Sequence, residues 1–536
     1  MVRFCFIGKI LEHPCNFLCV GVLYLTRCLY WAFSAAYEFV TYCVSHFLIE
    51  VCYFTLVSCL GFVILKGLRP RTHATRPSDL DLFFTSVSAT TVSSMSTVEM
   101  EVFSNAQLIV LTILMFIGGE VFTSMVALHF KASRLRNTPL KARSRVNSVA
   151  SLELPPEGFD HIEMGIITSS NTTTLVETKS EVDFFLKSKS IRVLGFVVLA
   201  YLLVINLLGF IMVLAYLNIV PSSKKVLEEK GLKTLTFSIF TIVSTFASCG
   251  FLPTNENMVV FRRNSGLLLM LIPQMLLGNT LFPSFLRLSI WVLGKFAKKD
   301  EAEYLLRNTK EIGYHHLLQS KHSKYLVGTV LGFILVPFIL FCSMDWSLGG
   351  LEGMNLYQKV VGVLFQCVNA RHTGESIVDL STVASATLVV FVIMMYLPPY
   401  TCFLPSKNQE EEDGYPEIFK KRGAIILEKI KFSQLSYVVI FVVIICIIER
   451  QKMKDDPLNF NIFNIVLEVV SAYGNVGFSM GYSCERQLKP DANCVDKWFG
   501  FAGKWSDQGK TVLILVMFFG RLKKFNMNGG QAWKLL

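Results

Sequence analysis

The chain has 536 residues, of which 52% are hydrophobic and only 17% are charged. In soluble domains about a quarter of the residues are charged, and two soluble domains of this total length could not keep so much apolar surface from water. The same composition excludes a disordered chain. We therefore predict an all-α integral membrane protein whose apolar helices face the lipid bilayer.

The net charge of +11 is expected of a membrane protein, because lysine and arginine concentrate in cytoplasmic loops. We therefore expect no nucleic-acid partner. The first 45 residues are apolar but interrupted by basic residues, without a clear signal-peptide cleavage site. We interpret residues 1–45 as an N-terminal segment that is cytoplasmic or lies at the membrane interface.

Eight apolar stretches follow along the chain as four pairs. A bilayer core of about 30 Å requires roughly 20 helical residues to cross it. Each pair encloses a shorter segment rich in Ser, Thr, Asn and Gly, which is typical of a re-entrant loop. The predicted spans are 46–65 and 106–129, 192–219 and 265–294, 325–344 and 384–403, and 434–448 and 510–522.

The four pairs are similar to one another, which indicates internal repeats. Their second stretches share a Met-x-x-Gly pattern, with proline in place of glycine in the third pair. The enclosed segments end as SATTVSSM, STFASCGF, VNARHTGE and SAYGNVGF. We therefore predict four tandem helix–pore loop–helix repeats, with eight transmembrane helices, around a central pore. The pattern residues are Met115 and Gly118, Met275 and Gly278, and Met517 and Gly520, with Met395 and Pro398 as the variant.

Basic residues orient these repeats. The connections contain KASRLRNTPLKARSR, KFAKK and FKKRG, which predict a cytoplasmic location and place both termini of this multi-pass chain in the cytoplasm. The basic stretches RPRTHATRP and SSKKVLEEK then lie outside, because the repeat pattern outweighs local charge. The predicted parts are repeat A at 46–130, a connection at 131–190, repeat B at 191–296, a connection at 297–322, repeat C at 323–404, a connection at 405–431, and repeat D with a short C-terminus at 432–536.

The end of each pore loop carries the chemistry. A narrow ring of backbone carbonyls can replace the hydration shell of a cation. Glycine suits such a ring because it adopts left-handed dihedral angles freely and adds no side chain. Alternatively, these small residues let helices pack closely, as they often do in membranes. The four predicted selectivity-filter residues are Ser94, Gly250, Gly374 and Gly477.

Polar residues surround these positions. Repeat A carries serine where the others carry glycine, and the preceding Thr-Val-Ser run resembles the TVG run of potassium-channel filters. The histidine two residues before Gly374 is interpreted as packing rather than as a pH sensor. The predicted filter-flanking residues are Thr91, Val92, Ser93, Ser248, Cys249, His372, Thr373, Asn475 and Val476.

Acidic residues follow each predicted filter position. A mouth lined with carboxylates would concentrate cations and repel anions. The acid beside Gly374 is the strongest candidate, and the alternative for each acid is ordinary solvated surface. The predicted outer-mouth acids are Glu99, Glu101, Glu256, Glu375 and Asp379.

Arg521 directly follows Gly520 in the last predicted helix, where a charge is costly unless it faces water or a partner. Facing the pathway, it would form an electrostatic barrier below the filter. Alternatively, its side chain reaches the cytoplasmic interface beside Lys523 and Lys524. Glu120 is the other ionisable residue near the middle of a predicted span.

The chain shows no phosphate-binding loop, zinc-protease or serine-hydrolase motif, so we expect neither an enzyme nor a cofactor. His315 and His316 lie in a basic connection and are interpreted as part of a solvated helix. The fourteen cysteines show no zinc-binding pattern. Cys484 and Cys494 bracket a polar loop, and a disulfide between them is predicted if that loop is extracellular.

The four pore loops, in order, resemble those of the plant HKT high-affinity potassium transporter family of the Trk/Ktr/HKT superfamily. The resemblance covers nearly all of residues 46–536. It implies four membrane–pore–membrane repeats, a homodimer, and a pathway restricted by Arg521. Serine at position 94 is similar to the sodium-selective subfamily I, whereas glycine there is similar to the potassium/sodium-cotransporting subfamily II.

The resemblance therefore implies passive, channel-like sodium transport at a plant plasma membrane, with roles in sodium homeostasis and salt tolerance. Sodium would bind to backbone carbonyls at the filter. A side chain in the ring would narrow it and weaken the fit for potassium, whereas sodium accepts asymmetric coordination completed by water. The alternatives are sodium–potassium symport or potassium uptake, and a proton- or sodium-coupled alternating-access carrier, which would use inverted repeats.

Overall fold

The computed structural model describes residues 46–71, 76–133, 135, 170–401, 434–488 and 494–526, and it contains no β-strand within these ranges. The predicted N-terminal segment 1–45, the connection 405–431 and most of the connection 131–190 lie outside the described residues. The chain forms two units, residues 1–56 and 57–536. The interactions below lie within the second unit.

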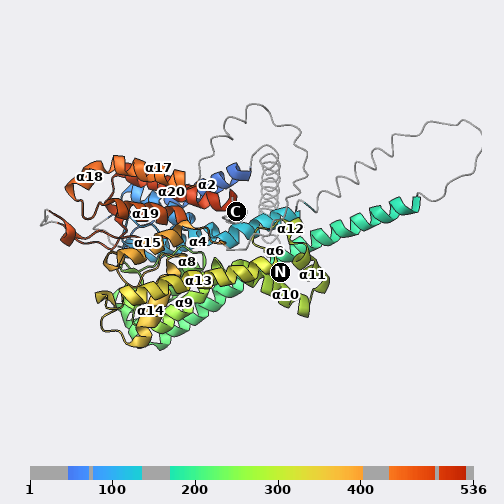
Figure 1. Ribbon diagram of the computed structural model, residues 1–536, viewed down its shortest axis with the longest axis horizontal. Coiled ribbons are helices and arrows are strands. Elements are labelled where there is room, and N and C mark those ends of the chain that lie inside the picture. Colours follow the sequence, from blue (N-terminus) through green and yellow to red (C-terminus); the bar gives the residue numbers. More distant parts are fainter. Residues whose placement is uncertain are drawn as a thin grey trace, which may run out of the picture. The chain divides into compact units, whose positions relative to one another are not determined.

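Helices occupy the positions of all four predicted repeats (Figure 1). Group A, residues 57–133, contains the end of α2 (His46–Gly67), α3 (Asp79–Thr90), α4 (Asn105–Gly118) and the helix Glu120–Ser133. Group B, residues 170–296, contains α6 (Ser170–Ile219), α7 (Pro221–Glu229), α8 (Thr234–Phe246), α9 (Ser265–Gly278) and α10 (Phe282–Phe296). Helices α11 (Lys299–Arg307) and α12 (Thr309–Ile312) lie in the connection between groups B and C.

The second half of the chain follows the same plan. Group C, residues 320–401, contains α13 (Ser320–Met344), α14 (Leu356–Asn369) and α15 (Ser385–Tyr396). Group D, residues 434–526, contains α17 (Gln434–Ile448), α18 (Arg450–Asp455), α19 (Ile462–Gly474) and α20 (Asp507–Asn526). Short 3₁₀ turns lie at Met100–Val102, Asn257–Phe261, Gly349–Leu351, Leu380–Thr382, Cys484–Arg486 and Phe501–Lys504.

Within the described ranges, three single helices are long and apolar enough to cross a membrane, at Leu48–Gly67, Phe185–Ile219 and Ser320–Met344. The predicted spans 106–129 and 265–294 are each broken into two helices. The axes bend by 54° between α4 and the helix Glu120–Ser133, and by 81° between α9 and α10. Both breaks directly follow the glycine of Met-x-x-Gly.

The start of α6 is a second difference from the sequence-based boundaries. This helix begins at Ser170, well inside the predicted connection 131–190. The last part of the connection, from Ser170 onward, is therefore helical before the apolar part of group B begins. Polar helix-forming residues in this stretch, such as Glu177 and Lys179, carry no apolar signal that would mark a helix as part of a span.

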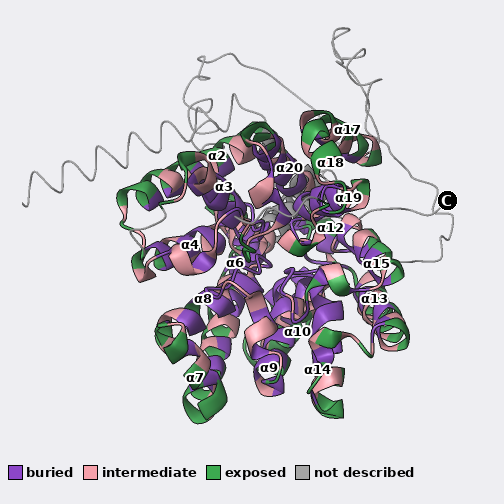
Figure 2. Ribbon diagram, turned by 90° about the vertical axis from the view of Figure 1, so that its left-hand side faces the viewer, coloured by how far each residue is buried: buried purple, intermediate pink, exposed green. Residues whose placement is uncertain are grey.

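The four groups follow one another around a closed ring. Helix α4 packs against α8, α9 against α14, α15 against α19, and α20 against α3. Each contact joins neighbouring groups, and the last returns from group D to group A. Figure 2 shows buried residues toward the centre of this arrangement and exposed residues on its outer helices.

One short helix in each group ends inside the ring: α3, α8, α14 and α19. These helices have 12 to 14 residues, about 20 Å at 1.5 Å per residue, so none can cross a bilayer core of about 30 Å. Ser78 caps the start of α3, and Asn355 forms a capping box with Gln358 at the start of α14. Helices of this length are compatible with re-entrant segments, and the re-entrant interpretation stays a prediction.

The Met-x-x-Gly pattern has a packing reason. A Cβ atom added to Gly118 would lie 2.0 Å from the Thr90 carbonyl oxygen, which is at the end of α3. Corresponding distances are 1.9 Å between Gly278 and Phe246, and 2.1 Å between Gly520 and Tyr473. In three groups, glycine therefore lets a second helix touch the end of the short helix. Group C has Pro398 at the position of this glycine. There, Arg371 Nη2 donates a hydrogen bond to the Pro398 carbonyl at 2.6 Å.

Gly278→Ala is expected to destabilise the protein by about 3 kcal/mol, because the methyl group must displace backbone rather than a flexible side chain. The measurement is thermal unfolding of the purified protein in detergent. Gly332→Ala in α13 is the matched control, since no atom lies within 4 Å of its added Cβ. An equal effect of the two substitutions would contradict this packing argument.

Candidate functional site

The loops after the four short helices meet at one cavity. Its volume is about 290 Å³. Ser94, Gly250, Gly374 and Gly477 all line it, one from each group. We call these four the ring residues and this space the outer cavity. The ring residues were predicted by aligning the four repeated segments, and the fold brings them together at this cavity.

The backbone of the ring residues is left-handed in all four groups. The φ angles are 53° at Ser94, 88° at Gly250, 68° at Gly374 and 100° at Gly477. Glycine adopts such angles freely, whereas a serine there costs about 1–3 kcal/mol. Strain of this kind clusters at functional sites because only the surrounding structure can hold it.

A second left-handed residue lies two positions before the ring residue in three groups. These residues are Val92, Ser248 and Asn475, with φ angles of 54°, 61° and 52°. Positive φ is rare for a β-branched residue such as valine and more easily adopted by asparagine. The three loops therefore share an unusual backbone course, which links their function to main-chain groups rather than to side chains.

The ring residues contact one another in the order of the groups. An added Cβ on Gly250 would lie 1.6 Å from the Thr373 carbonyl oxygen, and one on Gly374 would lie 2.4 Å from that of Val476. One on Gly477 would lie 2.2 Å from the Ser94 Cβ. Helix α8 of group B packs against α4 of group A, which closes the circle. The three glycines have no space for a side chain.

Serines six residues earlier hold two of the loops. The amide of Gly250 donates to Ser244 Oγ, and the amide of Gly477 donates to Ser471 Oγ, both at 3.0 Å. This explains the Ser-x₅-Gly spacing in groups B and D. Groups A and C differ. Ser88 Oγ has no hydrogen-bond partner among the described residues, and group C uses Asn369 in place of a serine.

Asn369 holds the loop of group C through its side-chain oxygen. This oxygen accepts hydrogen bonds from Thr373 Oγ1 and from the amide of Glu375, the latter at 3.2 Å. His372 is fully buried in the same loop, where its ring nitrogens bond Thr280 Oγ1 at 2.8 Å and the Val368 carbonyl at 2.6 Å. Its contacts are those of a packing residue.

A polar network lies beside Ser94. Asn475 Nδ2 donates to Ser93 Oγ at 2.7 Å, and Ser93 Oγ lies 2.7 Å from Thr91 Oγ1. Asn475 belongs to group D, whereas the two hydroxyl groups belong to group A. The network therefore joins groups A and D next to the place where the Ser94 side chain lies against Gly477.

The predicted acids occupy different environments. Glu256 and Asp379 line the outer cavity. Glu99 accepts a hydrogen bond from the amide of Trp498 at 3.3 Å. Glu101 and Glu256 both form ion pairs with Lys230, at 2.6 and 2.5 Å.

The structure corrects the expectation for Glu375. Its side chain is completely buried and is not part of the cavity lining. Its Oε1 atom accepts a hydrogen bond at 2.7 Å from Thr245 Oγ1 in α8. Glu375 therefore lies between groups B and C, because the chain turns away from the cavity directly after Gly374.

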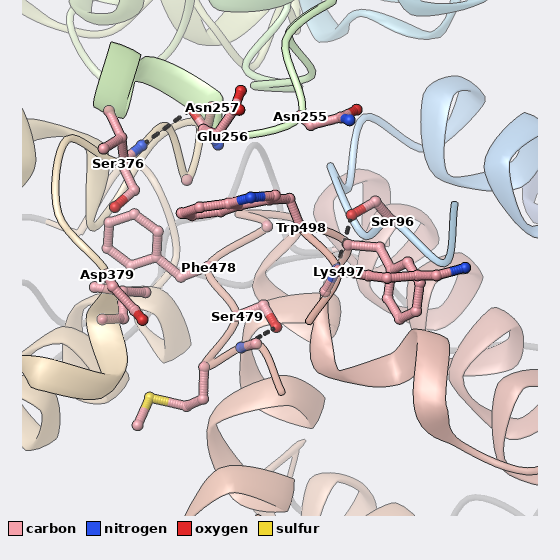
Figure 3. A pocket seen from close by; sticks show the side chains of 18 of the residues that line it. Ser96, Asn255, Glu256, Asn257, Ser376, Asp379, Phe478, Ser479, Lys497 and Trp498 are labelled. Carbon is pink, nitrogen blue, oxygen red and sulfur yellow. Dashed lines mark hydrogen bonds between the residues drawn. The ribbon is translucent and has the colours of Figure 1, made fainter. Parts of the chain in front are cut away.

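A segment of group D covers the outer cavity. Cys484 and Cys494 form the predicted disulfide, with Cα atoms 5.9 Å apart. Beyond it, the indole of Trp498 lies across the cavity (Figure 3). The amide of Gly500 donates to Ser96 Oγ at 3.1 Å, and Arg486 donates to Ser381 Oγ. This cover thus contacts groups A and C.

Arg521 is buried, with 1% of its surface exposed. It donates a hydrogen bond to the carbonyl of Gly118, the last residue of α4. By contrast, Lys523 extends over the ring of Tyr473, with Nζ 3.6 Å from the ring centre. The guanidinium group of Arg521 therefore lies among the buried helix ends and not at the exposed end of α20.

Sequence reasoning missed a buried polar cluster near the two helix breaks. His316 Nδ1 lies 3.0 Å from Tyr400 Oη and 4.0 Å from Glu120 Oε1. Tyr314 Oη lies 3.0 Å from Ser124 Oγ. The predicted solvated helix is therefore wrong for His316, which lies in a turn and is buried. Its partners are distant in sequence and share no motif with it.

Comparisons with known proteins place these features in a family. The family model for TrkH, a cation transport protein, matches residues 164–403 and 422–527. Cation transporter HKT1;3 of Oryza sativa subsp. japonica is 51% identical over 91% of this chain and 91% of its own length. Sodium transporter HKT1 of Arabidopsis thaliana is 49% identical over 88% and 91%, respectively.

The potassium transporter TrkH of Vibrio parahaemolyticus has a solved crystal structure with 14% identity and a TM-score of 0.46, covering 90% of this chain and 84% of that one. The family match and the two plant relatives identify a membrane transporter rather than an enzyme. This chain belongs to the TrkH/HKT family of cation transporters.

Proposed function

We propose that the chain conducts sodium passively, in preference to potassium, through the ring formed by Ser94, Gly250, Gly374 and Gly477. One observation carries this proposal: four left-handed backbone segments, one from each group, meet in cyclic order at one cavity. Backbone carbonyls held in this way could replace the water shell of the transported cation. The cation is the cargo of the site.

Selectivity for sodium rests on Ser94. It supplies the one side chain within the ring, and its Cβ occupies the space beside Gly477. A ring narrowed at one corner fits the larger potassium ion less well, whereas sodium accepts an uneven shell completed by water. The name of the Arabidopsis relative, a sodium transporter, supports the same cargo.

The proposed membrane arrangement is four helix–pore loop–helix repeats with eight spans around the central pathway. The cyclic packing of groups A to D supports it. The basic connections favour cytoplasmic termini. We further propose a homodimer in a plant plasma membrane, with a role in sodium homeostasis and salt tolerance, and no cofactor. These assignments rest on the family and its plant members.

The direct test is two-electrode voltage recording in oocytes while bath sodium is replaced by potassium. The reversal potential is expected to shift by about 59 mV per tenfold change in sodium and to stay almost constant for potassium. Equal responses to the two ions would favour sodium–potassium symport or potassium uptake. Absence of current, with the chain at the cell surface, would contradict passive transport.

Arg521→Gln is expected to increase inward sodium current about two- to tenfold and to weaken rectification, because a buried cation near the pathway repels the cargo. Recordings at equal surface abundance measure the effect. Arg521→Lys keeps the charge and should stay close to wild type. Lys523→Gln is the control at the same helix end. Unchanged current in Arg521→Gln would mean that Arg521 forms no barrier.

A further inference from the structure

Lys230 forms a clasp between two acids, one of which lines the outer cavity. Its ammonium nitrogen lies 2.6 Å from Glu101 Oε1 and 2.5 Å from Glu256 Oε2. The three side chains are only 17–25% exposed. Glu101 belongs to group A, whereas Lys230 and Glu256 belong to group B, so the clasp joins two neighbouring groups.

The position of Lys230 is fixed by further contacts. Arg71 Nη2 donates to the carbonyls of Lys230 and Gly231, each at 2.8 Å. Gly231 is left-handed at φ 59°, and an added Cβ there would lie 2.5 Å from Arg71 Nη2. Glu101 is held as well, because its Oε1 accepts from the amide of Asn255 at 3.1 Å. The backbone of Lys230 is therefore held by Arg71, and its side chain can move only if the ion pairs with Glu101 and Glu256 break.

The ammonium group of Lys230 stays charged. Burial alone would lower the pKa of Lys230, but the hydrogen bonds and charges of Glu101 and Glu256 outweigh it and raise that pKa above its ordinary value. Ion pairs this short and partly shielded from water interact more strongly than exposed surface pairs.

The clasp bears on the charge of the outer cavity. Among the described residues, three acids, Glu256, Asp379 and Asp496, and two bases, Arg486 and Lys497, line this cavity. Asp379 and Asp496 accept hydrogen bonds from the amides of Ser381 and Cys484, and neither forms an ion pair within the part of the chain that the structure describes. The described part of the lining thus carries a small negative charge, and Glu256 is the acid in it that forms an ion pair with Lys230.

We propose that Lys230 is a tethered counter-ion that limits how strongly the outer cavity attracts cations before they reach the ring. This inference rests on the proposed function. Lys230 acts through Glu101 and Glu256 and does not touch the cargo, so it is a positioning residue. Without its charge, Glu101 and Glu256 lose their counter-ion, and the two carboxylates attract cations from the medium.

The test compares Lys230→Gln with wild type in sodium titrations at low and high ionic strength, with an impermeant salt as the screen. The half-saturating sodium concentration is expected to fall about threefold at low ionic strength, and the difference should vanish at high ionic strength. Lys230→Arg should behave as wild type. Lys224→Gln is the matched control, because it removes the same charge from adjacent α7 without touching either acid.

Glu256→Gln is the second variant, in case Lys230→Gln does not reach the surface. It removes one of the two negative charges that balance Lys230. The half-saturating sodium concentration should therefore rise at low ionic strength. The role of Lys230 would be overturned if the half-saturating sodium concentration of either variant equals that of wild type. It would also be overturned if the change is the same at low and high ionic strength. Absence of sodium current in wild type would instead refute the proposed function, so the two failures are distinguishable.

Discussion

Gly250→Ala is expected to abolish sodium current. The added Cβ would lie 1.6 Å from the Thr373 carbonyl oxygen in the neighbouring group, and φ at this residue is 88°. Backbone cannot yield as a flexible side chain can, so the contact between groups B and C must open. A left-handed alanine adds roughly 1–2 kcal/mol of strain. A ring of carbonyls can replace the water shell of the cation only when all four ring residues hold their positions. Displacement of one ring residue is therefore expected to abolish conduction.

The measurement is sodium current in oocytes, normalised by surface biotinylation. Gly481→Ala is a close control, because Gly481 also lines the outer cavity and is left-handed at φ 62°, yet no atom lies within 4 Å of its added Cβ. It should cost only backbone strain and retain most of the current. Normal current in Gly250→Ala at equal surface abundance would show that the ring does not carry the ion.

Ser94→Gly is expected to admit potassium and raise the potassium-to-sodium permeability ratio about tenfold, which corresponds to about 1.4 kcal/mol of discrimination. The substitution removes the side chain that contacts Gly477 and relieves a serine held at φ 53°. The four corners then become alike, and a wider, more symmetric ring fits the larger ion.

Reversal potentials with bath sodium and potassium exchanged measure this change. Ser96→Gly is the control, since Ser96 lines the same cavity two residues further along but lies outside the ring. It should leave the permeability ratio unchanged. Currents carried only by sodium in Ser94→Gly would refute the steric explanation of selectivity.

Local patterns explain why much of this site is visible in the sequence. Ser-x₅-Gly marks a hydroxyl group that accepts the amide of a ring glycine, as at Ser244 and Ser471. Met-x-x-Gly marks a helix that must touch the carbonyl end of another, as at Gly278. Both patterns act within one group and recur, so each copy strengthens the interpretation of the others.

The helix breaks and the acids were less predictable. A glycine in an apolar run is compatible with a straight span, and only its contact with the Phe246 carbonyl shows where α9 ends and bends. Glu375 follows a ring residue just as the other acids do. Its burial against Thr245 depends on how groups B and C meet, which no local pattern records.

The sequence by itself indicated a helical membrane protein, and it singled out Ser94 and the three glycines that line one cavity, because hydropathy and backbone freedom are properties of short segments. Only the tertiary structure decided which acids face the cavity and which charges are paired. Lys230 lies 129 residues from Glu101, and His316 lies 84 residues from Tyr400. Such pairs form only when separate groups pack, and their electrostatic energy depends on distance and burial in space.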